Sequence, residues 1–264
     1  MIKVYARGND FYDDNRDFLL TNPYTEFFFR LDAPLLTETN KEEYAIKVFN
    51  DEKTLLVLEK EPYDVLFFGD KELIGELIDY LITNSYKLNS FLCPLELGEE
   101  ISSYLKDKGI NFKLDLGMDF MVCREKSLPS SALVEHASSD DLDAIYENVL
   151  AFIKDCGLKD KVTKEKVAKN LQYYRIIRVG NEIAAMASFY VATKDDMKIT
   201  NVYTKNKYRG KGFAKLICTS ILNEIIDSGK YATLNVDIKN PVSYHIYSSI
   251  GFKRVFSQGI FGKE

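Results

Sequence analysis

The segment Arg209–Ala214, which reads Arg-Gly-Lys-Gly-Phe-Ala, places two glycines and two cations at an expected strand-to-helix turn. The alternating pattern of Lys198–Thr204 predicts the strand, and an apolar stripe predicts a helix that runs to about Asp227. Glycine lets a backbone approach a ligand closely, and the first N–H groups of a helix have no acceptor inside it. The helix dipole also favours negative charge there. We therefore predict a phosphate or pyrophosphate site formed by Arg209, Gly210, Lys211, Gly212, Phe213, Ala214 and Lys215.

This turn does not match the two best-known phosphate loops. No GxxxxGK(S/T) string occurs, and Gly210-Lys211-Gly212 lacks the third glycine of the dinucleotide fingerprint. A glycine-containing turn with a basic surface therefore remains an alternative, and Lys215 could equally be a solvated helix position.

A second cluster of chemically informative residues follows the helix. The alternation of residues 234–238 predicts a strand, and Asn240 followed by Pro241 is typical of an N-cap and the first helical position. Gly251 is placed to end this short helix. Asn240 and Tyr247 are seven residues apart, or about two helical turns, and so share one helical face.

With both clusters present, the chain resembles the GNAT superfamily of acyl-CoA-dependent N-acyltransferases. Residues 209–214 match the family's acyl-CoA motif, Q/R-x-x-G-x-G/A. The family's later motif, N-x-x-A/S-x-x-L/I-Y-x-x-x-G-F, is matched by Asn240, Ser243, Ile246, Tyr247, Gly251 and Phe252. The resemblance covers roughly residues 130–264 and implies an α+β GNAT acyltransferase fold, in which helices flank a mixed central sheet.

The resemblance also implies roles for individual residues. Val202, Tyr203 and Thr204 correspond to the end of a strand whose backbone pairs with the pantetheine arm of the cofactor, although ordinary strand pairing is an alternative. Tyr247 corresponds to the general acid that protonates the departing thiolate. Asn240 would contact the cofactor arm, or would serve only as a helix cap.

This chain lacks the residue that serves as the general base in many of the proteins it resembles. Many relatives have a glutamate five residues before the motif asparagine, and this chain has Asn235 there. Asp237 lies on the same face of the strand and is a tentative base acting through water, with a solvated acid as the alternative. An α-amino acceptor would need little base catalysis, because with a pKa of about 8 a useful fraction of the amine is already neutral at pH 7.

Composition limits the remaining functions. The chain has 264 residues and a formal net charge of −5, which argues against broad binding of nucleic acid or anionic membranes. Its four cysteines are scattered, with no CxxC pair, which indicates reduced thiols. With only two histidines in the chain, we expect no metal site. Residues 1–5 lack an apolar signal core, and no run approaches the roughly 18 apolar residues of a membrane span. We expect a cytoplasmic location; the sequence leaves the oligomeric state open.

The length suits two domains, with a linker expected at Arg124–Ala132. Residues 128–264 would form the catalytic domain. Residues 1–127 repeat a fainter version of the same strand and helix order, which indicates a degenerate GNAT-like α/β domain, with an unrelated α/β domain as the alternative. The corresponding turn, Phe68–Glu72, has one glycine and two acids, so we expect no acyl-CoA there.

These observations predict an acyl-CoA-dependent N-acyltransferase that uses acetyl-CoA as co-substrate. We expect direct attack by a primary amine of a small molecule or amino acid, because the tandem layout resembles the glycine N-acyltransferase branch. Two alternatives remain: a catalytically silent acyl-CoA-binding or sensing module, and a protein or peptide N-acetyltransferase.

Overall fold

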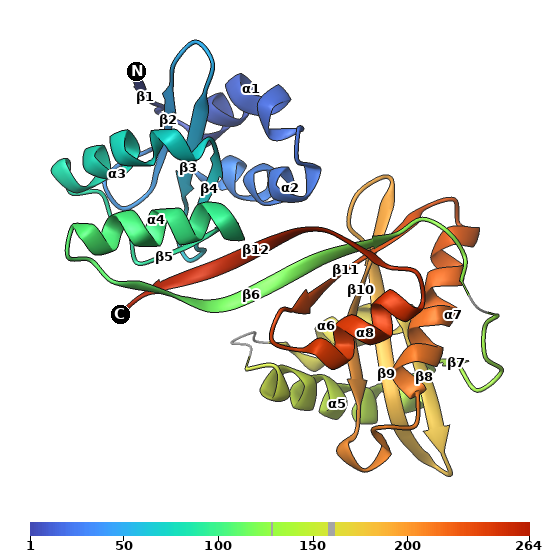
Figure 1. Ribbon diagram of the computed structural model, residues 1–264. Helices are drawn as coiled ribbons and strands as arrows, with labels where there is room; N and C mark the ends of the chain where they lie inside the picture. The colour runs from blue at the N-terminus through green and yellow to red at the C-terminus, as the bar shows by residue number, and fades with distance from the viewer. Residues whose placement is uncertain (128, 158–161) are drawn as a thin grey trace. The chain divides into compact units, whose positions relative to one another are not determined.

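The computed structural model describes residues 1–127, 129–157 and 162–264. The chain divides into two compact units (Figure 1). The first comprises residues 1–118 and 256–264, and the second comprises residues 119–255. Two long strands, β6 (Phe112–Cys123) and β12 (Lys253–Lys263), contribute residues to both units. Each unit is described separately below.

The second unit is built on an antiparallel meander followed by a parallel strand. Its strands are β7 (Glu135–His136), β8 (Tyr174–Val179), β9 (Glu182–Val191), β10 (Asp196–Thr204) and β11 (Tyr231–Asp237). Together with the end of β6 they lie in the order β6-β11-β10-β9-β8-β7, and β11 runs parallel to β10. Its helices are α5 (Leu142–Asp155), α6 (Lys164–Lys169), α7 (Phe213–Asp227) and α8 (Pro241–Ser249), with 3₁₀ turns at 139–141, 171–173 and 206–208.

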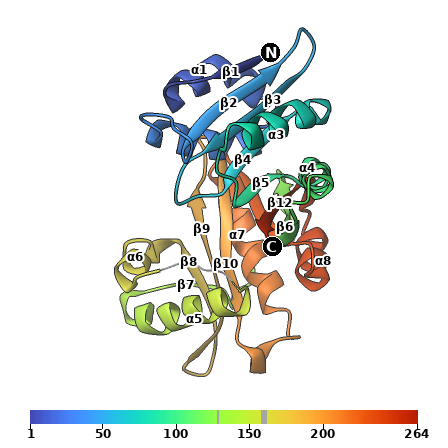
Figure 2. The ribbon, with the colours of Figure 1, turned by 90° about the vertical axis from the view of Figure 1, so that its left-hand side faces the viewer.

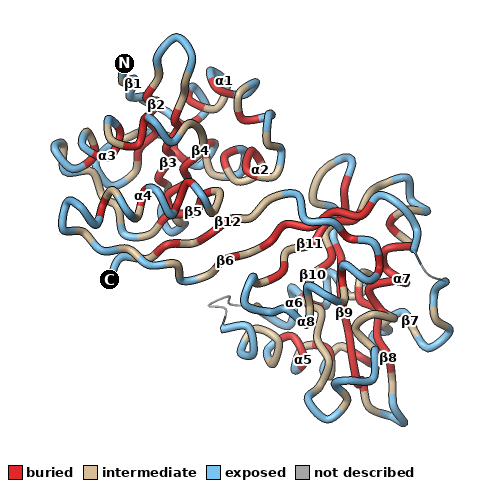
Figure 3. The backbone as a smooth tube through the Cα atoms, viewed as in Figure 1, coloured by how far each residue is buried: buried red, intermediate tan, exposed pale blue. Residues whose placement is uncertain are grey.

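Helices cover both faces of this sheet (Figure 2), so strand residues alternate between two apolar cores. Met197 and Ile199 of β10 belong to the core under α7 and α8. Ile176 and Met186, from β8 and β9, belong to the core under α5 and α6. Figure 3 shows the resulting band of buried backbone along the central strands.

An ion pair between a buried arginine and a partly exposed glutamate fixes α7 to the sheet. Arg175 of β8 is 5% exposed, and its Nε donates to Oε1 of Glu224 on α7 at 2.8 Å. Its Nη1 donates to the carbonyls of Gln172 and Tyr174, both at 2.9 Å. The guanidinium also lies 5.2 Å from the ring of Phe189. The charge is therefore satisfied on several sides, which is the condition for a buried ion pair to be tolerated.

The first unit repeats this order of elements. Its strands are β1 (Ile2–Val4), β2 (Tyr44–Phe49), β3 (Thr54–Glu59), β4 (Val65–Gly69) and β5 (Ser90–Pro94); its helices are α1 (Gly8–Leu19), α2 (Pro23–Asp32), α3 (Ile74–Thr83) and α4 (Leu95–Asp107), with 3₁₀ turns at 33–35 and 71–73. Strands β2, β3 and β4 form an antiparallel meander, and β5 runs parallel to β4. One core lies under α3 and α4, and another under α1 and α2.

The boundary between the units differs from the one expected. The sequence placed it after residue 127, whereas the compact units meet between Met118 and Asp119. The chain also returns to the first unit at its end, where Gln258–Gly262 pairs antiparallel with Ser90–Pro94. An alternating pattern predicts a strand but does not identify the strand that pairs with it. The sequence therefore did not predict the pairing of residues 258–262 with β5. Leu128, in the expected linker, lies outside the described residues.

The ion pair gives a direct stability test. Glu224→Gln should lower the free energy of unfolding by about 3 kcal/mol, because the buried guanidinium of Arg175 would lose its countercharge. The double variant Arg175→Met/Glu224→Leu should recover most of that loss, because no charge is then left buried. Urea unfolding of the three proteins measures the difference. Equal losses in the single and double variants would show that charge compensation is not what Glu224 provides.

Candidate active site

The turn between β10 and α7 is left-handed at both of its glycines. Gly210 has φ 77° and Gly212 has φ 78°, a region that disfavours residues with a side chain. A Cβ at either position would meet no atom within 4 Å. Glycine is therefore required here by backbone conformation, and the space beside the turn is open.

The turn leaves a run of backbone donors without acceptors. Within the described residues, none of the six N–H groups from Gly210 to Lys215 donates to a protein acceptor, and the first such bond is from Leu216 N to Gly212 O at 3.1 Å. This stretch is exposed at its start and partly buried at its end (Figure 3). Consecutive free N–H groups at a helix N-terminus form an anion-binding concavity.

A cluster of charges holds the loop that leads into this turn. Glu182 of β9 accepts a hydrogen bond from Lys205 Nζ at 2.9 Å and from the Tyr208 hydroxyl at 2.8 Å, and it also pairs with Lys207. These donors lower the pKa of Glu182 to about 2. The sequence analysis did not identify Glu182, because its partners lie more than 20 residues further along the chain.

The cations of the turn have different roles. Arg209 donates from Nε to the Thr204 carbonyl at 3.0 Å and from Nη2 to Oδ2 of Asp155 at 2.7 Å. Its guanidinium thus braces the turn against the end of β10 and the end of α5. Lys211 lies 5.4 Å from the ring of Tyr208. Neither Lys211 nor Lys215 forms an ion pair with a described residue, so both remain available to an anion.

Strands β10 and β11 pair over only three residues. The parallel register covers Asp196–Lys198 against Tyr231–Thr233, and no later pairing of the two strands is present among the described residues. On its other side, β10 has a bulge against β9 between Thr200 and Tyr203. Asn201 in this bulge has φ 51°, and its amide donates to Ser188 Oγ at 2.9 Å. Val202 also lies within this bulge, and Tyr203 and Thr204, which follow it, pair with β9.

Helix α8 begins and ends largely as the sequence predicts. Asn240 caps it, since its Oδ1 accepts the Ser243 N–H at 3.0 Å. Tyr247 is 7% exposed and packs in the α7 core, with its ring centroid 6.3 Å from that of Phe252. Burial raises the pKa of Tyr247 above its ordinary value, and a hydrogen bond from Ser243 opposes this. The phenol therefore keeps its proton at neutral pH and can act as a donor.

Cys156, an exposed residue that follows α5, interacts electrostatically with several predicted site residues. Burial raises the pKa of its thiol; Asp155 and Asp237 raise it further, and Arg209 opposes them. The same thiol interacts electrostatically with Tyr247. Arg209, Asp237 and Tyr247 come from three separate elements, and each interacts electrostatically with this thiol. Nothing in the sequence marked Asp155 or Cys156, because both simply end a helix.

The tentative base, Asp237, has a structural partner. Its Oδ1 accepts the Lys239 N–H at 2.8 Å, and its carbonyl accepts the Asn240 N–H at 2.8 Å. It is therefore part of the turn that leads into α8, while one carboxylate oxygen remains for other contacts.

Lys198 is a further polar residue that sequence reasoning missed. It is opposite Thr233 in the last residue pair that joins β10 and β11. Its ammonium lies 5.4 Å from the ring of Phe120 and forms no ion pair with a described residue. Burial lowers the pKa of Lys198 to about 8, and Asp196 opposes the shift. A lysine in this state supplies a proton acceptor close to neutral pH.

Comparison with known proteins assigns this arrangement to a family. Residues 174–261, about a third of the chain, match the family model described as GNAT acetyltransferase. The matched stretch includes the strand bulge, the glycine turn and α8. This stretch of the chain is similar to the GNAT acetyltransferases.

Known GNAT proteins resemble this chain at low sequence identity. One curated relative, from Bacillus subtilis (strain 168), is provisionally named a ribosomal protein bS18-alanine N-acetyltransferase; it is 21% identical over 127 residues, which are 48% of this chain and 83% of the relative. The solved GCN5-related N-acetyltransferase from Sphaerobacter thermophilus superposes with a TM-score of 0.68 at 12% identity, covering 99% of this chain and 95% of that one. A GNAT-family acetyltransferase from Colwellia psychrerythraea gives 0.63 at 11% identity, covering 100% and 99%. These likenesses establish the GNAT fold of this α+β protein.

Among the described residues, no helix is long and apolar enough to cross a membrane. No group of three or more histidine, cysteine, aspartate or glutamate residues could hold a metal ion there.

The left-handed turn predicts a matched pair of glycine effects. Gly212→Ala and Gly109→Ala should each lower the free energy of unfolding by about 1–2 kcal/mol, because Gly109 has φ 79° and equally open surroundings. Gly212→Asn should cost less, since asparagine tolerates this conformation better. Chemical unfolding checks both statements. A Gly212→Ala protein as stable as the wild type would contradict the left-handed turn.

Proposed function

We propose that this N-acetyltransferase takes acetyl-CoA as its donor and a primary amine of a small molecule or amino acid as its acceptor. The observation that supports the donor is the run of six backbone N–H groups from Gly210 to Lys215 that find no acceptor among the described residues. Beside them, the ammonium groups of Lys211 and Lys215 form no ion pair with any of those residues. Such a site suits a pyrophosphate, because both its geometry and its charge favour a multiply charged anion.

Other residues would hold the rest of the cofactor. In this proposal, the backbone of Val202, Tyr203 and Thr204 lines the pantetheine arm, because β10 runs on after its pairing with β11 has ended. Phe213 and Ala214 place the first turn of α7 against the pyrophosphate. The side-chain oxygen of Asn240 is engaged as a helix cap, so a cofactor contact from this residue would use its amide nitrogen.

The proposed reaction is direct transfer. The neutral amine attacks the thioester carbonyl, the C–N bond forms, and the C–S bond breaks as the sulfur leaves with its electron pair. Tyr247 donates its phenolic proton to that sulfur, which suits a buried phenol held in the neutral form. The attacking nitrogen loses its extra proton to solvent or to a protein base.

Two side chains are candidates for the base. Asp237 is the tentative choice from sequence, and its position beside the α8 turn leaves it able to act through water. Lys198 is the alternative that the structure adds, because its lowered pKa near 8 gives a neutral amine at mildly alkaline pH. Lys198 is largely protonated at neutral pH, so an acceptor of low pKa is favoured.

We further propose that the first unit is a degenerate GNAT copy that does not bind acyl-CoA. At its corresponding turn, a Cβ on Gly69 would lie 2.1 Å from the Thr54 carbonyl oxygen, so the chain is packed there and not open. Asp70 exchanges hydrogen bonds with Thr54, as its N–H donates to the carbonyl and its Oδ2 accepts the Thr54 N–H, both at 2.8 Å. Backbone and acid thus occupy the place that a pyrophosphate would need.

This assignment predicts one acyl-CoA per chain. Gly212→Asp should abolish binding because it places a carboxylate among the donors of the turn. Gly109→Asp is the matched control, with the same φ and the same added charge, and it should bind as the wild type does. Titration calorimetry with acetyl-CoA measures both. Two sites per chain, or unchanged affinity in the Gly212→Asp protein, would refute the assignment.

The role of Tyr247 can be isolated from binding. Tyr247→Phe should lower kcat by roughly 10²–10⁴-fold while the Kd for acetyl-CoA stays nearly unchanged, because only a proton donor is removed. Because the pKa of Tyr247 is raised, the wild-type rate should show no decline from its ionisation up to about pH 10. A parallel loss of acetyl-CoA binding would indicate a packing role instead.

The acceptor preference follows from the weak base. At pH 7 a lysine side chain is about 0.04% neutral and an α-amine about 10% neutral, so α-amines should have the higher kcat/KM. A panel of amino acids, alkylamines and a peptide with an N-terminal alanine tests this, and the peptide addresses the protein-acceptor alternative. No turnover with any amine would support the silent binding module. A lysine preference with a controlling pKa of about 6–7 would contradict the weak-base assignment.

The two candidate bases give different pH profiles. Asp237→Asn keeps an oxygen for the Lys239 N–H and so preserves the turn. If Asp237 is the base, this variant should lose roughly a hundredfold or more in kcat/KM. If Lys198 is the base, Lys198→Met should show that loss and should remove a rise in rate centred near pH 8. If both variants keep the wild-type profile, the acceptor's own titration controls the rate.

A further inference from the structure

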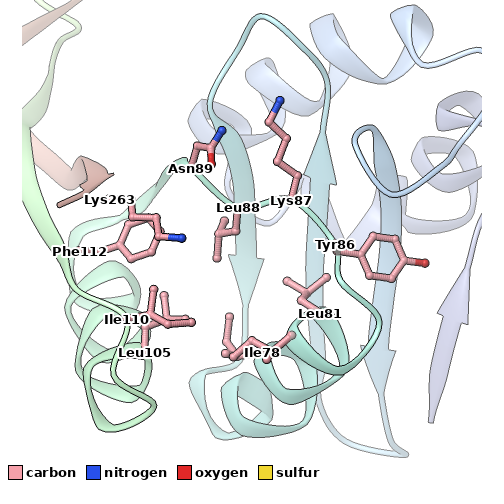
Figure 4. Close-up of a pocket in the computed structure, with 11 residues that line it drawn as sticks. Ile78, Leu81, Tyr86, Lys87, Leu88, Asn89, Leu105, Ile110, Phe112 and Lys263 are labelled. Atoms are coloured by element: carbon pink, nitrogen blue, oxygen red, sulfur yellow. The ribbon is translucent and has the colours of Figure 1, made fainter.

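The first unit contains two pockets that share Lys87 and Asn89 in their linings. One, of about 290 Å³, is lined mostly by apolar residues, with Ile78 and Leu81 facing Leu105 and Ile110 (Figure 4). The other, of about 260 Å³, is polar and is lined by Glu59, Glu61, Pro62, Tyr63, Lys87, Asn89 and Ser90. The second pocket lies far in sequence from the glycine turn of α7 and plays no part in the reaction proposed above.

Glu59, the last residue of β3, is the unusual member of the polar pocket. Its exposure is 5%, yet among the described residues its carboxylate accepts no hydrogen bond and forms no ion pair. It is directly opposite Tyr44 of β2, whose hydroxyl donates to the Lys87 carbonyl at 2.6 Å and is therefore engaged elsewhere. A buried carboxylate without a partner is costly, and native proteins seldom retain one without a reason.

The cations around Glu59 already have other partners. Lys87 pairs with Glu61 and, at 3.3 Å, with Glu42, and its side chain points away from the apolar pocket (Figure 4). Lys60 pairs with Glu43. The surroundings of Glu59 therefore contain more acid than base.

Burial raises the pKa of Glu59 to about 8. Lys87 opposes this shift, whereas Glu61, Asp64 and Glu43 increase it. Asp64 accepts a hydrogen bond from the Ser90 hydroxyl, which leaves its charge in place. The field at Glu59 is thus one that a cation, but not an anion, would relieve.

We propose that this pocket binds a small organic ammonium ion, with Glu59 as the carboxylate that pairs with it. Tyr63 is 52% exposed and, with Pro62, offers an aromatic and apolar wall for the carbon skeleton next to the charge. The pocket is slightly smaller than the usual range of small-molecule sites, which suits a short alkylammonium. The described residues offer no cluster that could hold a metal ion instead. This proposal does not depend on the acetyl-transfer reaction.

Binding of an ammonium ion would displace the proton that Glu59 holds at neutral pH. At pH 7 a carboxyl with a pKa of about 8 is about 90% protonated, so close to one proton should be released for each ion bound. The association constant should accordingly rise almost tenfold between pH 6 and pH 7 and should level off above pH 8. An ordinary surface carboxylate would show neither effect.

The test uses the full chain and n-butylammonium chloride as the probe, with sodium butyrate as the probe of opposite charge. Calorimetric titrations in two buffers of different ionisation heat give both the affinity and the number of protons released. Glu59→Gln should lower the affinity for n-butylammonium at least tenfold. Glu72→Gln, which alters an exposed carboxylate paired with Lys53, should leave that affinity unchanged. Tyr63→Ala should weaken binding severalfold without changing proton release.

The variants also separate this pocket from acceptor binding. Any heat of n-butylammonium binding that the Glu59→Gln protein still gives comes from the acceptor site. The difference between its binding heat and that of the wild type comes from this pocket. Glu59→Gln should fold, because it replaces a protonated carboxyl with an isosteric amide; the wild type should lose stability relative to it as pH rises from about 5 to about 8. Unchanged ammonium affinity in Glu59→Gln, binding without proton release at pH 7, or equal binding of butyrate would overturn the proposal.

Discussion

The site depends on how α7 is held. Six backbone N–H groups, in the turn before α7 and in its first three residues, have no acceptor among the described residues, which is tolerable because the turn is open to solvent. The helix cannot gain rigidity from that end. It gains it from its middle and far end, where Ile217, Ile221 and Ile225 are fully buried and Glu224 pairs with the buried Arg175. Packing at one end thus leaves the other free to bind an anion.

The second structural feature of this region is the point at which β10 and β11 stop pairing. Parallel pairing stops after Lys198 and Thr233, and the bulge at Asn201 turns the rest of β10 while its amide remains bonded to Ser188. Extra local twist at a bulge is a usual way to end a ladder. The Cys156 thiol, which follows α5, interacts electrostatically with Asp237 of β11 and with Tyr247 of α8.

The two units show that a shared order of elements does not fix chemistry. Both contain a meander, a helix and a parallel strand, but their turns before the helix differ. At Gly69 the backbone of β3 lies against the turn, and Asp70 bonds to Thr54. At Gly212 nothing lies within 4 Å of where a Cβ would be. Closed packing in one unit and open space in the other separate a structural turn from an anion site.

The sequence by itself determined the features that depend on near neighbours in the chain. It predicted the strands at 44–49 and 174–179, the glycine turn, the Asn240 cap and the family, because turns, caps and periodicity are local. Tertiary structure alone decided the partners. Only the fold pairs Arg209 with Asp155, returns residues 258–262 to β5, and buries Glu59 with no ion pair to a described residue. Those outcomes depend on which distant segments meet, and neither residue type nor spacing encodes that locally.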